Sequence, residues 1–396
     1  MQDQWDIIIV GNGIAGFSAA KAARQQSASC SVLLIGDEDR VPYKRTQLSK
    51  TIAAGFDRDA FQLQPVQWYE ANRIQLMVAQ RVVSISPRSH SLVLSSGETL
   101  RWSQLILATG SSPISPTFAQ AGLPRVFVVR TAKAVEELIE TVRGVDSVCI
   151  VGASVLGVEI AAQVVALGKK ISLISNSSPL MSRHLDRVAA DLLAKEFMVR
   201  GVDLIFDQAV ENLTDGPNGR LILSLKNNQI ETELCVFCTG VRSNVGLARA
   251  AELAVNRGIL VDRCLRTSHP DVYAAGDVAE HPDGELTGLW HAAEDQGLIA
   301  GANAAGANML NPQLPFRLKC EVFGRYFFSI NRPSDSDLPG FEVRPGFAGS
   351  MYRCLYFRAD ILHGVVMVDD SGRARQYEAA VREGWVKDRV LAEFTL

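Results

Sequence analysis

The sequence predicts an α/β fold with two similar halves and a smaller α+β segment at the C-terminal end. Three observations predict it. An apolar run ending at Val10 leads into G-x-G-x-x-G over residues 11–16, and a small-residue helix follows. A second apolar run, residues 147–151, leads into a similar glycine pattern over residues 152–157. From about residue 315 the chain changes to short runs that are typical of antiparallel strands.

The first glycine pattern predicts a dinucleotide site. Gly11 is expected to make the tight turn from strand to helix, and Gly13 to let the backbone approach a pyrophosphate. Gly16 is expected to let the helix pack close to the strand. A bound diphosphate would lie on the free N–H groups at the helix start. The next strand ends in Asp37-Glu38, where an acid can bind a ribose.

The rest of the first half contains further strands. We expect strands between residues 74 and 94, and a buried strand at residues 105–110 that ends in a small-residue turn. The basic, proline-interrupted stretch of residues 41–50 is predicted to lie outside the core. Residues 111–113, with Pro116, are predicted to form a linker.

The second half repeats this order of elements. Its predicted helices cover residues 132–143, the stretch up to residue 167, and residues 186–199; its predicted strands cover residues 147–151, 171–174, 202–206 and 221–225. Residues 235–240 close this half as residues 105–110 close the first. The chain therefore holds an internal duplication that is weak in sequence but clear in the order of its motifs.

The remaining chain first returns to buried strands. Strand-like runs at residues 259–262 and 271–279 precede an alanine-rich helix over residues 289–306. The antiparallel strands that follow are predicted at residues 318–323, 326–330, 351–357 and 361–368. One closing helix is predicted over residues 377–390.

Composition excludes several classes of protein. Lys and Arg number 40 and Asp and Glu 43, for a formal net charge of −3, so nucleic acid is not an expected ligand. No apolar run reaches membrane-spanning length, so we expect no membrane partner. The first predicted strand begins within a few residues of the start, which leaves no room for a signal peptide. Seven cysteines without framework spacing indicate reduced thiols and a cytoplasmic location.

Five markers give the chain a family resemblance over nearly its whole length. They are Gly11–Gly16, Arg45–Lys50, Ala108-Thr109-Gly110, the second glycine pattern with Glu159, and Tyr273–Asp277. In this order they resemble the FAD-dependent pyridine nucleotide oxidoreductases. Within that family the chain looks most like the ferredoxin and rubredoxin reductase branch, whose members include putidaredoxin reductase-like and flavorubredoxin reductase-like proteins.

The resemblance implies a fold and a division into domains. The expected fold is the glutathione-reductase-like flavoprotein fold, with two Rossmann-like dinucleotide-binding domains and a small C-terminal α+β domain. The expected boundaries are residues 1–113 for the first part of the FAD-binding domain, 114–242 for the NAD(P)H-binding domain, 243–314 for the second part of the FAD-binding domain, and 315–396 for the C-terminal interface domain.

The resemblance also implies which residues bind FAD. Asp37 is expected at the ribose, with Glu38 as its competitor, and Lys50 near the reactive edge of the flavin, where a cation stabilises negative charge. The full expected FAD set is Gly11, Gly13, Ile14, Ala15, Gly16, Asp37, Glu38, Arg45, Lys50, Val82, Ala108, Thr109, Gly110, Arg130, Gly276, Asp277 and Trp290. Arg130 has a hinge ion pair as its alternative, and Trp290 a place in the core.

The second glycine pattern implies the nicotinamide dinucleotide site. The expected residues are Gly152, Ser154, Val155, Leu156, Gly157, Glu159 and Gly240. Ser154 replaces a glycine, which restricts close backbone approach. Glu159 resembles the acid that reaches toward the nicotinamide and can pair with Lys50, so these two are the expected catalytic residues. The alternative for Glu159 is an acid favoured at a helix N-terminus by the helix dipole.

Missing cysteines narrow the chemistry. Disulfide reductases of this fold need two cysteines just after the second strand, and related peroxidases and oxidases need one; residues 38–55 contain none. Cys235 and Cys238 have the spacing of a redox or zinc pair, but they lie in an apolar run and no second pair completes a metal site. We interpret them as core cysteines. The six histidines show no ligand spacing, so no metal is expected.

Together with the missing cysteines, the resemblance implies an enzyme that passes electrons from NADH through FAD to a small carrier of the rubredoxin or ferredoxin type. NADPH stays open as the donor, because Ser175–Ser178 offers neither an acid nor an arginine after its strand. One alternative is an NAD(P)H oxidase or a reductase of a small molecule, nitrite-linked or quinone. Another is a regulatory flavoprotein with slow turnover. Residues 315–396 carry twelve basic and eleven acidic residues, so no basic docking face is evident. Both a monomer and a homodimer are compatible with the branch.

Overall fold

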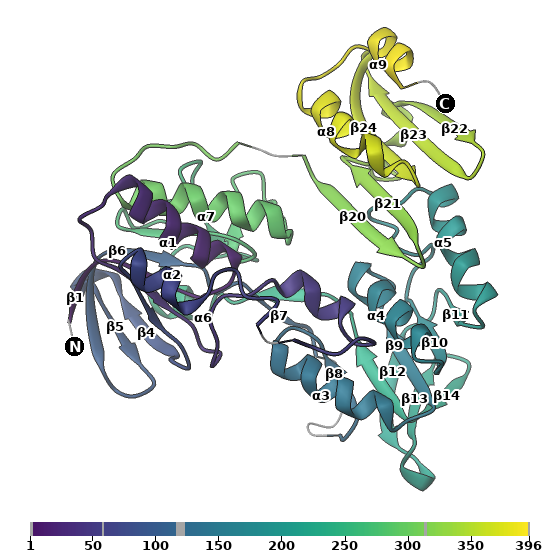
Figure 1. Cartoon of the computed structure of the whole chain (residues 1–396), viewed down its shortest axis with the longest axis horizontal. Coiled ribbons are helices and arrows are strands. Elements are labelled where there is room, and N and C mark those ends of the chain that lie inside the picture. The colour runs from purple at the N-terminus through teal and green to yellow at the C-terminus, as the bar shows by residue number, and fades with distance from the viewer. Residues whose placement is uncertain (1–2, 58, 116–122, 313–314, 395–396) are drawn as a thin grey trace. The chain divides into compact units, whose positions relative to one another are not determined.

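The computed structural model describes residues 3–57, 59–115, 123–312 and 315–394 (Figure 1). The chain divides into two compact units. The first comprises Met1–Gln47, Asp57–Ser112 and Val241–Gln313, and the second comprises Leu48–Phe56, Pro113–Gly240 and Leu314–Leu396. The α/β fold class is confirmed. The four-part division predicted from the sequence is finer than these two units and stays a prediction.

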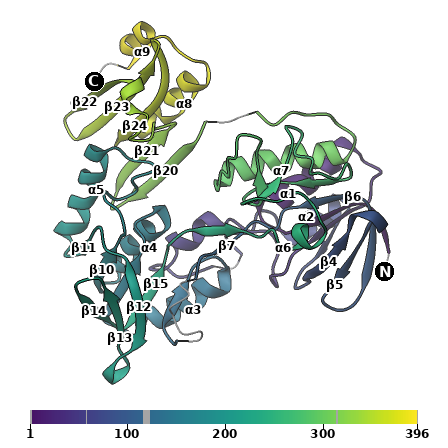
Figure 2. The same cartoon turned by 180° about the vertical axis from the view of Figure 1, so that it is seen from behind.

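The first unit is built on a twisted, largely parallel sheet in the order β3-β2-β1-β6-β5-β4, with β18 pairing with β6. Its strands are β1 (Gln4–Val10), β2 (Val32–Ile35), β3 (Ile74–Met77), β4 (Val82–Ser86), β5 (Ser91–Leu94), β6 (Thr99–Leu107) and β18 (Val272–Ala274). β5 is antiparallel to both β4 and β6, and the other neighbouring strands are parallel. Figure 2 shows this hairpin beside β6.

Two helices, α1 (Ile14–Gln26) and α7 (Trp290–Ala304), lie side by side over this sheet (Figure 1). Their close approach depends on two glycines of α7. A Cβ atom on Gly297 would lie 2.2 Å from the carbonyl oxygen of Ala15, and one on Gly301 would lie 2.1 Å from that of Ala19. The small residues of α7, from which the sequence predicted an alanine-rich helix, therefore allow its backbone to pack directly against that of α1.

The strands β5 and β18 follow one another along the same edge of β6. Ser91 pairs with Arg101 in β6, and Val272 pairs with Leu105. Because β1 occupies the other edge of β6, the residues of β6 between Arg101 and Leu105 span the junction of β5 and β18. The loops that enter these two strands meet at this junction.

The second unit holds a parallel sheet in the order β11-β10-β9-β15-β8. Its strands are β8 (Val126–Val128), β9 (Ser147–Val151), β10 (Lys170–Ile174), β11 (Asp203–Ile205) and β15 (Leu234–Phe237), and its helices are α3 (Ala132–Arg143), α4 (Val155–Ala166) and α5 (Arg187–Val199). A separate antiparallel sheet contains β12 (Val210–Asp215), β13 (Leu221–Leu225) and β14 (Gln229–Thr232). The sequence predicted β9, β10, β11, β13 and β15 but not β8, β12 or β14.

The C-terminal part of this unit is an antiparallel sheet in the order β20-β21-β24-β23-β22. Its strands are β20 (Arg317–Val322), β21 (Arg325–Ile330), β22 (Glu342–Ala348), β23 (Met351–Arg358) and β24 (Ile361–Val368). Helices α8 (Ala374–Arg382) and α9 (Lys387–Glu393) cover one face. The single closing helix predicted at residues 377–390 is wrong, because the chain leaves the helix at Gly384, where φ is +62°.

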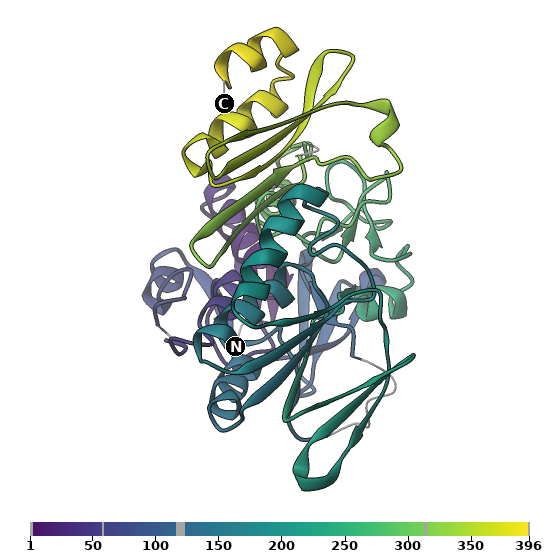
Figure 3. The ribbon, with the colours of Figure 1, turned by 90° about the vertical axis from the view of Figure 1, so that its right-hand side faces the viewer.

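The carboxylate of Asp186 helps to fasten this sheet to α5, which lies beside it in Figure 3. Asp186 is the N-cap of α5, and its Oδ1 accepts a hydrogen bond of 2.9 Å from the Ala189 backbone N–H. Its Oδ2 accepts hydrogen bonds from the hydroxyls of Tyr352 at 2.8 Å and Tyr356 at 3.2 Å. Both tyrosines are buried on β23. Asp186 thus both caps α5 and holds β23 through its two tyrosines.

Two shorter predictions also change. Ser111–Pro113 is not a linker but the short strand β7, which pairs with β16 (Val241–Ser243); Pro116 lies outside the described residues. The stretch 41–50 is only partly outside the core, because Tyr43 and Leu48 are buried. Between them Lys44 is exposed, whereas Arg45 is half-buried.

Candidate active site

The first glycine pattern forms a tight turn between β1 and α1. Gly11 has φ of +109°, and a Cβ atom there would lie 2.2 Å from the carbonyl oxygen of Ala108. A Cβ atom on Gly16 would lie 1.8 Å from the carbonyl oxygen of Gly11. Gly13 differs, since a Cβ atom there would meet no atom within 4 Å. Gly11 and Gly16 are therefore required by the chain itself, whereas Gly13 leaves open space in front of the helix.

The second glycine pattern repeats this geometry. Gly152 has φ of +113°, and a Cβ atom there would lie 2.4 Å from the carbonyl oxygen of Cys238. A Cβ atom on Gly157 would lie 1.9 Å from the carbonyl oxygen of Gly152. Ser154 takes the place of Gly13, and its Oγ donates to the carbonyl oxygen of Cys238 at 3.3 Å. The serine hydroxyl is thus directed back to the protein.

Both helices begin without a side-chain cap. Gly13 is the N-cap of α1 and Ser154 is the N-cap of α4, and neither makes a side-chain hydrogen bond to the helix start. The backbone N–H groups at the start of a helix have no partner within the helix, and they favour an anion. Residues 14–15 and 155–156 lie in these first turns. Each turn therefore fits a dinucleotide diphosphate.

The acid pair after β2 divides its roles. The carboxylate of Glu38 accepts hydrogen bonds from Tyr43 Oη at 2.9 Å and Arg45 Nη2 at 2.5 Å, and its side chain is 14% exposed. Asp37 is 55% exposed and lies 3.2 Å from Arg81. Since protein groups already hold Glu38, Asp37 is the acid that is available for a ribose. Arg45, which was predicted to bind FAD, forms an ion pair with Glu38 in the structure.

Replacing Asp37 by alanine is expected to weaken FAD binding about 10-fold, because a ribose would lose a charged hydrogen-bond acceptor. Glu38→Ala is the matched comparison, and we expect it to lower the free energy of unfolding instead, because it leaves Arg45 without its carboxylate. FAD retention after dialysis and urea unfolding measure the two effects. Full FAD stoichiometry in dialysed Asp37→Ala would contradict the assignment.

The turn after β6 is held from the other side of the first unit. Thr109 Oγ1 donates to the carbonyl oxygen of Asn244 at 3.0 Å, and Asn244 Nδ2 donates to that of Thr109 at 2.8 Å. The Asn244 N–H donates to the carbonyl oxygen of Gly110 at 2.9 Å. These three bonds fix Ala108-Thr109-Gly110 against the carbonyl-end edge of the sheet, beside Gly11.

Asp277 lies at the same edge of the first unit. Ser111 Oγ donates to its Oδ2 at 2.8 Å. Gly276 has φ of +82°, and its N–H donates to Oε1 of buried Gln296 at 2.8 Å. Of the remaining predicted FAD residues, Trp290 begins α7 half-buried against the core, and Val82 begins β4 and is buried. The structure thus gathers most of the predicted FAD set in the first unit.

Lys50, Glu159 and Ser49 form a polar cluster in the second unit. Glu159 lies on the second turn of α4 and its side chain is 11% exposed. Ser49 Oγ donates to its Oε2 at 2.5 Å, and Lys50 Nζ lies 3.8 Å from its Oε1. Burial raises the pKa of Glu159 above its usual 4.5, although Ser49 and Lys50 act in the opposite direction. The predicted pairing of Lys50 with Glu159 is present in the structure.

The raised pKa of Glu159 has a consequence for stability. Between pH 4.5 and the raised pKa, the folded chain binds more protons at Glu159 than the unfolded chain does, so the free energy of unfolding falls as the pH rises. Glu159→Gln stays neutral and is expected to flatten this part of the curve. Urea unfolding at several pH values measures it, with Glu140→Gln on the exposed face of α3 as control. An unchanged slope would contradict the assignment.

Two other predicted site residues, Arg130 and Gly240, have positions that do not test their predicted roles. Arg130 follows β8 in the second unit and is half-buried. Gly240 has φ of +106° and its carbonyl oxygen accepts a hydrogen bond from the Ile114 N–H at 3.0 Å. Their predicted contacts with FAD and NAD(P)H stay predictions.

All seven cysteines are free thiols. Cys235 and Cys238 are buried, and Cys235 pairs with Cys149 across β9 and β15, in agreement with a core role. The sequence analysis missed Cys320, which lies on β20 near enough to Glu159 and Lys50 to be influenced by both. Burial raises the pKa of Cys320 to about 12, so this thiol stays protonated and is a poor nucleophile. Cys320 is far from Lys50 and Glu159 in the sequence, so no local sequence pattern could have placed it near them.

Two uncapped dinucleotide turns, with an acid available after the first and a Lys–Glu pair beside the second, define a pyridine nucleotide-dependent flavoprotein fold. The pyridine nucleotide-disulphide oxidoreductase family matches residues 5–297. The chain belongs to this family, whose members use FAD and NAD(P)H. The resemblance to FAD-dependent pyridine nucleotide oxidoreductases that the sequence showed is confirmed, and the chain is an NAD(P)H-dependent flavoprotein oxidoreductase.

Three known proteins show how far the likeness extends. A ferredoxin reductase from Rhodopseudomonas palustris is 25% identical, with 98% of this chain and 97% of that chain covered and a TM-score of 0.88. A water-forming NADH oxidase from Lactobacillus brevis shares the fold at 20% identity, with 99% and 94% covered and a TM-score of 0.90. The assimilatory nitrate reductase electron transfer subunit of Bacillus subtilis is 28% identical over 301 residues, which are 76% of this chain.

That last match covers 39% of the Bacillus subtilis protein, so this chain spans about two-fifths of its length. The three relatives differ in what their names say of the electron acceptor, and the fold alone does not choose among them. Among the described residues, no helix is long and apolar enough to span a bilayer.

Proposed function

We propose that this chain takes electrons from NADH and passes them to a small iron–sulfur or rubredoxin-type protein. The observation that carries the proposal is the state of the thiols. Every cysteine is free, and Cys320, near Lys50 and Glu159, is a buried and protonated thiol. No pair of cysteines can accept electrons beside this cluster, so the electrons must leave to a separate acceptor. The free thiols also fit a reducing compartment such as the cytoplasm.

The residues of this chain supply binding and charge. The redox chemistry would be supplied by bound FAD, which is able to take up a hydride and to release electrons one at a time. Asp37 and the N–H groups of α1 would hold the ribose and diphosphate of FAD, and the N–H groups of α4 would hold the diphosphate of NADH. Lys50 offsets negative charge that develops during reduction. Ser49 and Lys50 fix the carboxylate of Glu159.

A basic hollow in the C-terminal part supports a protein partner. The hollow has a volume of about 600 Å³ and is lined by Arg317, Lys319, Arg375, Glu378, Ala379, Arg382 and Glu383. Its lining has four basic and two acidic side chains, so the hollow is locally positive. The nearly equal numbers of basic and acidic residues over residues 315–396 gave no indication of this local charge. Burial and the neighbouring Arg317 lower the pKa of Lys319, although Glu378 acts in the opposite direction.

Strand β20 connects the hollow to the polar cluster of Ser49, Lys50 and Glu159. On β20, Arg317 and Lys319 alternate with Leu318 and Cys320, so the two pairs point to opposite faces. Cys320 faces α4 and the Glu159–Lys50 pair, while Lys319 faces α8. An acidic carrier bound at the hollow would therefore lie across a single strand from the cluster. Electrostatic complementarity of this kind speeds the encounter of two proteins.

The first test is NADH consumption in air by the FAD-loaded chain, with and without added ferredoxin or rubredoxin. We expect the carrier to raise the rate many-fold and NADH to be preferred over NADPH. If oxygen alone sustained rapid turnover and the carrier added nothing, the chain would be an oxidase and the proposal would fail. Slow turnover with every acceptor would instead indicate a regulatory flavoprotein.

A charge-reversal variant tests the docking surface. Lys319→Glu combined with Arg375→Glu is expected to lower the second-order rate with an acidic carrier about 10-fold at low salt, because two exposed cations that attract the carrier become carboxylates that repel it. The rate with ferricyanide, which needs no docking surface, is expected to change little. Arg358→Glu, an exposed charge of β23 outside the hollow, is the matched control. Equal losses in both variants would contradict docking at the hollow.

A further inference from the structure

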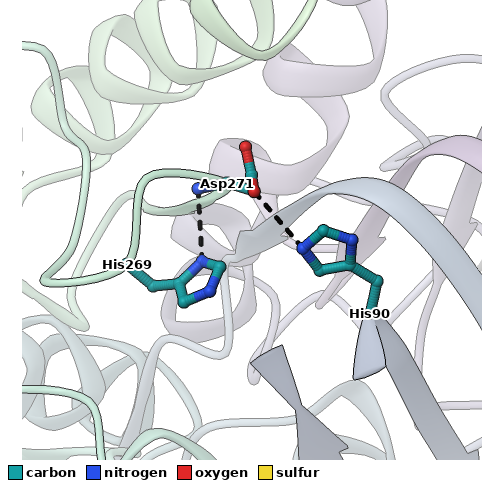
Figure 4. A group of neighbouring side chains, drawn as sticks. All are labelled: His90, His269 and Asp271. Carbon is teal, nitrogen blue, oxygen red and sulfur yellow. Dashed lines mark hydrogen bonds and ion pairs between the residues drawn. The ribbon is translucent and has the colours of Figure 1, made fainter. Parts of the chain in front are cut away.

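Two histidines and an aspartate form a cluster in the first unit that the proposed redox function does not use (Figure 4). His90 lies in the turn that leads into β5, and His269 and Asp271 lie in the loop that leads into β18. One ring nitrogen from each histidine and one carboxylate oxygen lie within 4.8 Å of one another. All three residues are half-buried, so an ion from solvent can reach them.

The junction along β6 orients two of these side chains. Gln104 Nε2 donates to Asp271 Oδ1 at 3.0 Å, which leaves Oδ2 directed at His90 Nε2, 3.3 Å away. The ring of His90 packs on that of Trp102, with centroids 4.6 Å apart. The backbone is fixed as well, since the Trp102 N–H donates to the carbonyl oxygen of His90 and the Leu105 N–H to that of Asp271.

The second histidine presents an unprotonated nitrogen. The Asp271 backbone N–H donates to His269 Nδ1 at 3.3 Å, so this nitrogen carries a lone pair on the side of the aspartate. Figure 4 shows both rings turned toward Asp271. The hydrogen bond is long, and a cation could replace it at small cost. The cluster therefore offers two imidazole rings and one carboxylate.

We propose that His90, His269 and Asp271 bind a divalent transition-metal ion that joins the β4–β5 hairpin to β18. Two imidazoles and a carboxylate are a donor set that suits Zn²⁺, Co²⁺, Ni²⁺ or Fe²⁺ rather than Mg²⁺ or Ca²⁺. With bonds of about 2.0–2.2 Å, tetrahedral ligand atoms lie about 3.3 Å apart, the separation that His90 and Asp271 already have. The ligand atom of His269 lies within 4.8 Å of the other two, so a small movement of this ring would complete the set, and solvent would fill the remaining position.

The hydrogen bond from Gln104 is part of this site. Carboxylates that ligate a metal are oriented by a hydrogen bond to their other oxygen, and such partners affect metal affinity. The sequence gave no signal for the cluster, because His90 and His269 are far apart in the chain and only the shared edge of β6 brings them together. That separation is why no metal was expected from the spacing of the histidines.

Titration of Zn²⁺ into the untagged, FAD-loaded full chain after treatment with a chelator tests the proposal. We expect one equivalent to bind, and Co²⁺ at the same site to show visible absorption bands of an imidazole–carboxylate complex. His269→Ala is expected to lower the affinity at least about 100-fold and Gln104→Ala about 10-fold. His363→Asn, a half-buried histidine on β24, is the matched control and should bind as the unchanged chain does.

Thermal unfolding provides a second readout that does not depend on activity. A ligand that binds only the folded chain raises its unfolding temperature, so Zn²⁺ should stabilise the unchanged chain and His363→Asn but not His90→Ala. Loss of binding in a variant that still holds FAD and unfolds cooperatively supports the site. No binding by the unchanged chain, or binding that His90→Ala and His269→Ala leave intact, would overturn the proposal.

Discussion

Replacing Lys50 by alanine is expected to slow the reduction of bound FAD by NADH about 100-fold, the scale for loss of one preorganised group that stabilises developing charge. Lys50 Nζ lies 3.8 Å from a buried carboxylate, and its own side chain is 43% exposed. Removing the ammonium group would leave the negative charge of Glu159 without its counter-charge. FAD should stay bound, because the variant leaves Asp37 and the first glycine turn, which are expected to hold its ribose and diphosphate, unchanged. Rapid mixing of the FAD-loaded variant with NADH measures the rate.

Two further variants make this result specific. Lys50→Arg keeps a positive charge and is expected to retain most of the rate. Lys44→Ala removes an exposed lysine from the same stretch and should have no effect. An unchanged reduction rate in Lys50→Ala would remove this residue from the mechanism, whereas loss of FAD from the variant would assign it to binding.

The glycines of the first turn should separate into two classes when each is changed to alanine. Gly13→Ala is expected to fold normally, because its methyl group would project into open space. If a diphosphate fills that space, the methyl group would clash with it and weaken FAD binding about 100-fold, a loss of about 3 kcal/mol in binding free energy. Gly16→Ala is expected to destabilise the chain by about 3 kcal/mol, because its methyl group would overlap the carbonyl oxygen of Gly11.

Urea unfolding of the two variants, together with their FAD content, measures this difference. Gly97→Ala is not a suitable control, because its φ of +89° would itself strain an alanine. Gly372→Ala, which meets no atom within 4 Å at an ordinary φ, is the better one. If Gly13→Ala bound FAD as tightly as the unchanged chain, the open space would not be a diphosphate site.

The sequence predicted most of the elements that bear the glycine turns. The helix at residues 132–143 and the strands at 147–151 and 221–225 have the predicted bounds. Apolar periodicity and the glycine pattern are local signals, and both dinucleotide turns depend on local geometry. The pairing of Lys50 with Glu159 was also found, but from a family resemblance, because no local pattern joins residues so far apart.

The features that were missed depend on contacts between distant segments. The strands β12, β14 and β22 are short or polar and acquire their structure from their neighbours in a sheet. The position of Cys320 near Glu159 and the cluster of His90 with Asp271 arise only when separate segments meet. The break at Gly384 was hidden by a helical pattern that continues on both sides of it.

The carboxylate of Asp186 has a consequence for how this protein can be divided or recombined. A fragment that stopped before β20 would leave one oxygen of that carboxylate without its two tyrosine donors, and it would expose the face of α5 on which the tyrosines lie. The last eighty or so residues are therefore not an interchangeable module. A chimera that takes this segment from a relative must therefore combine an acid at the start of α5 with two tyrosines four residues apart on β23.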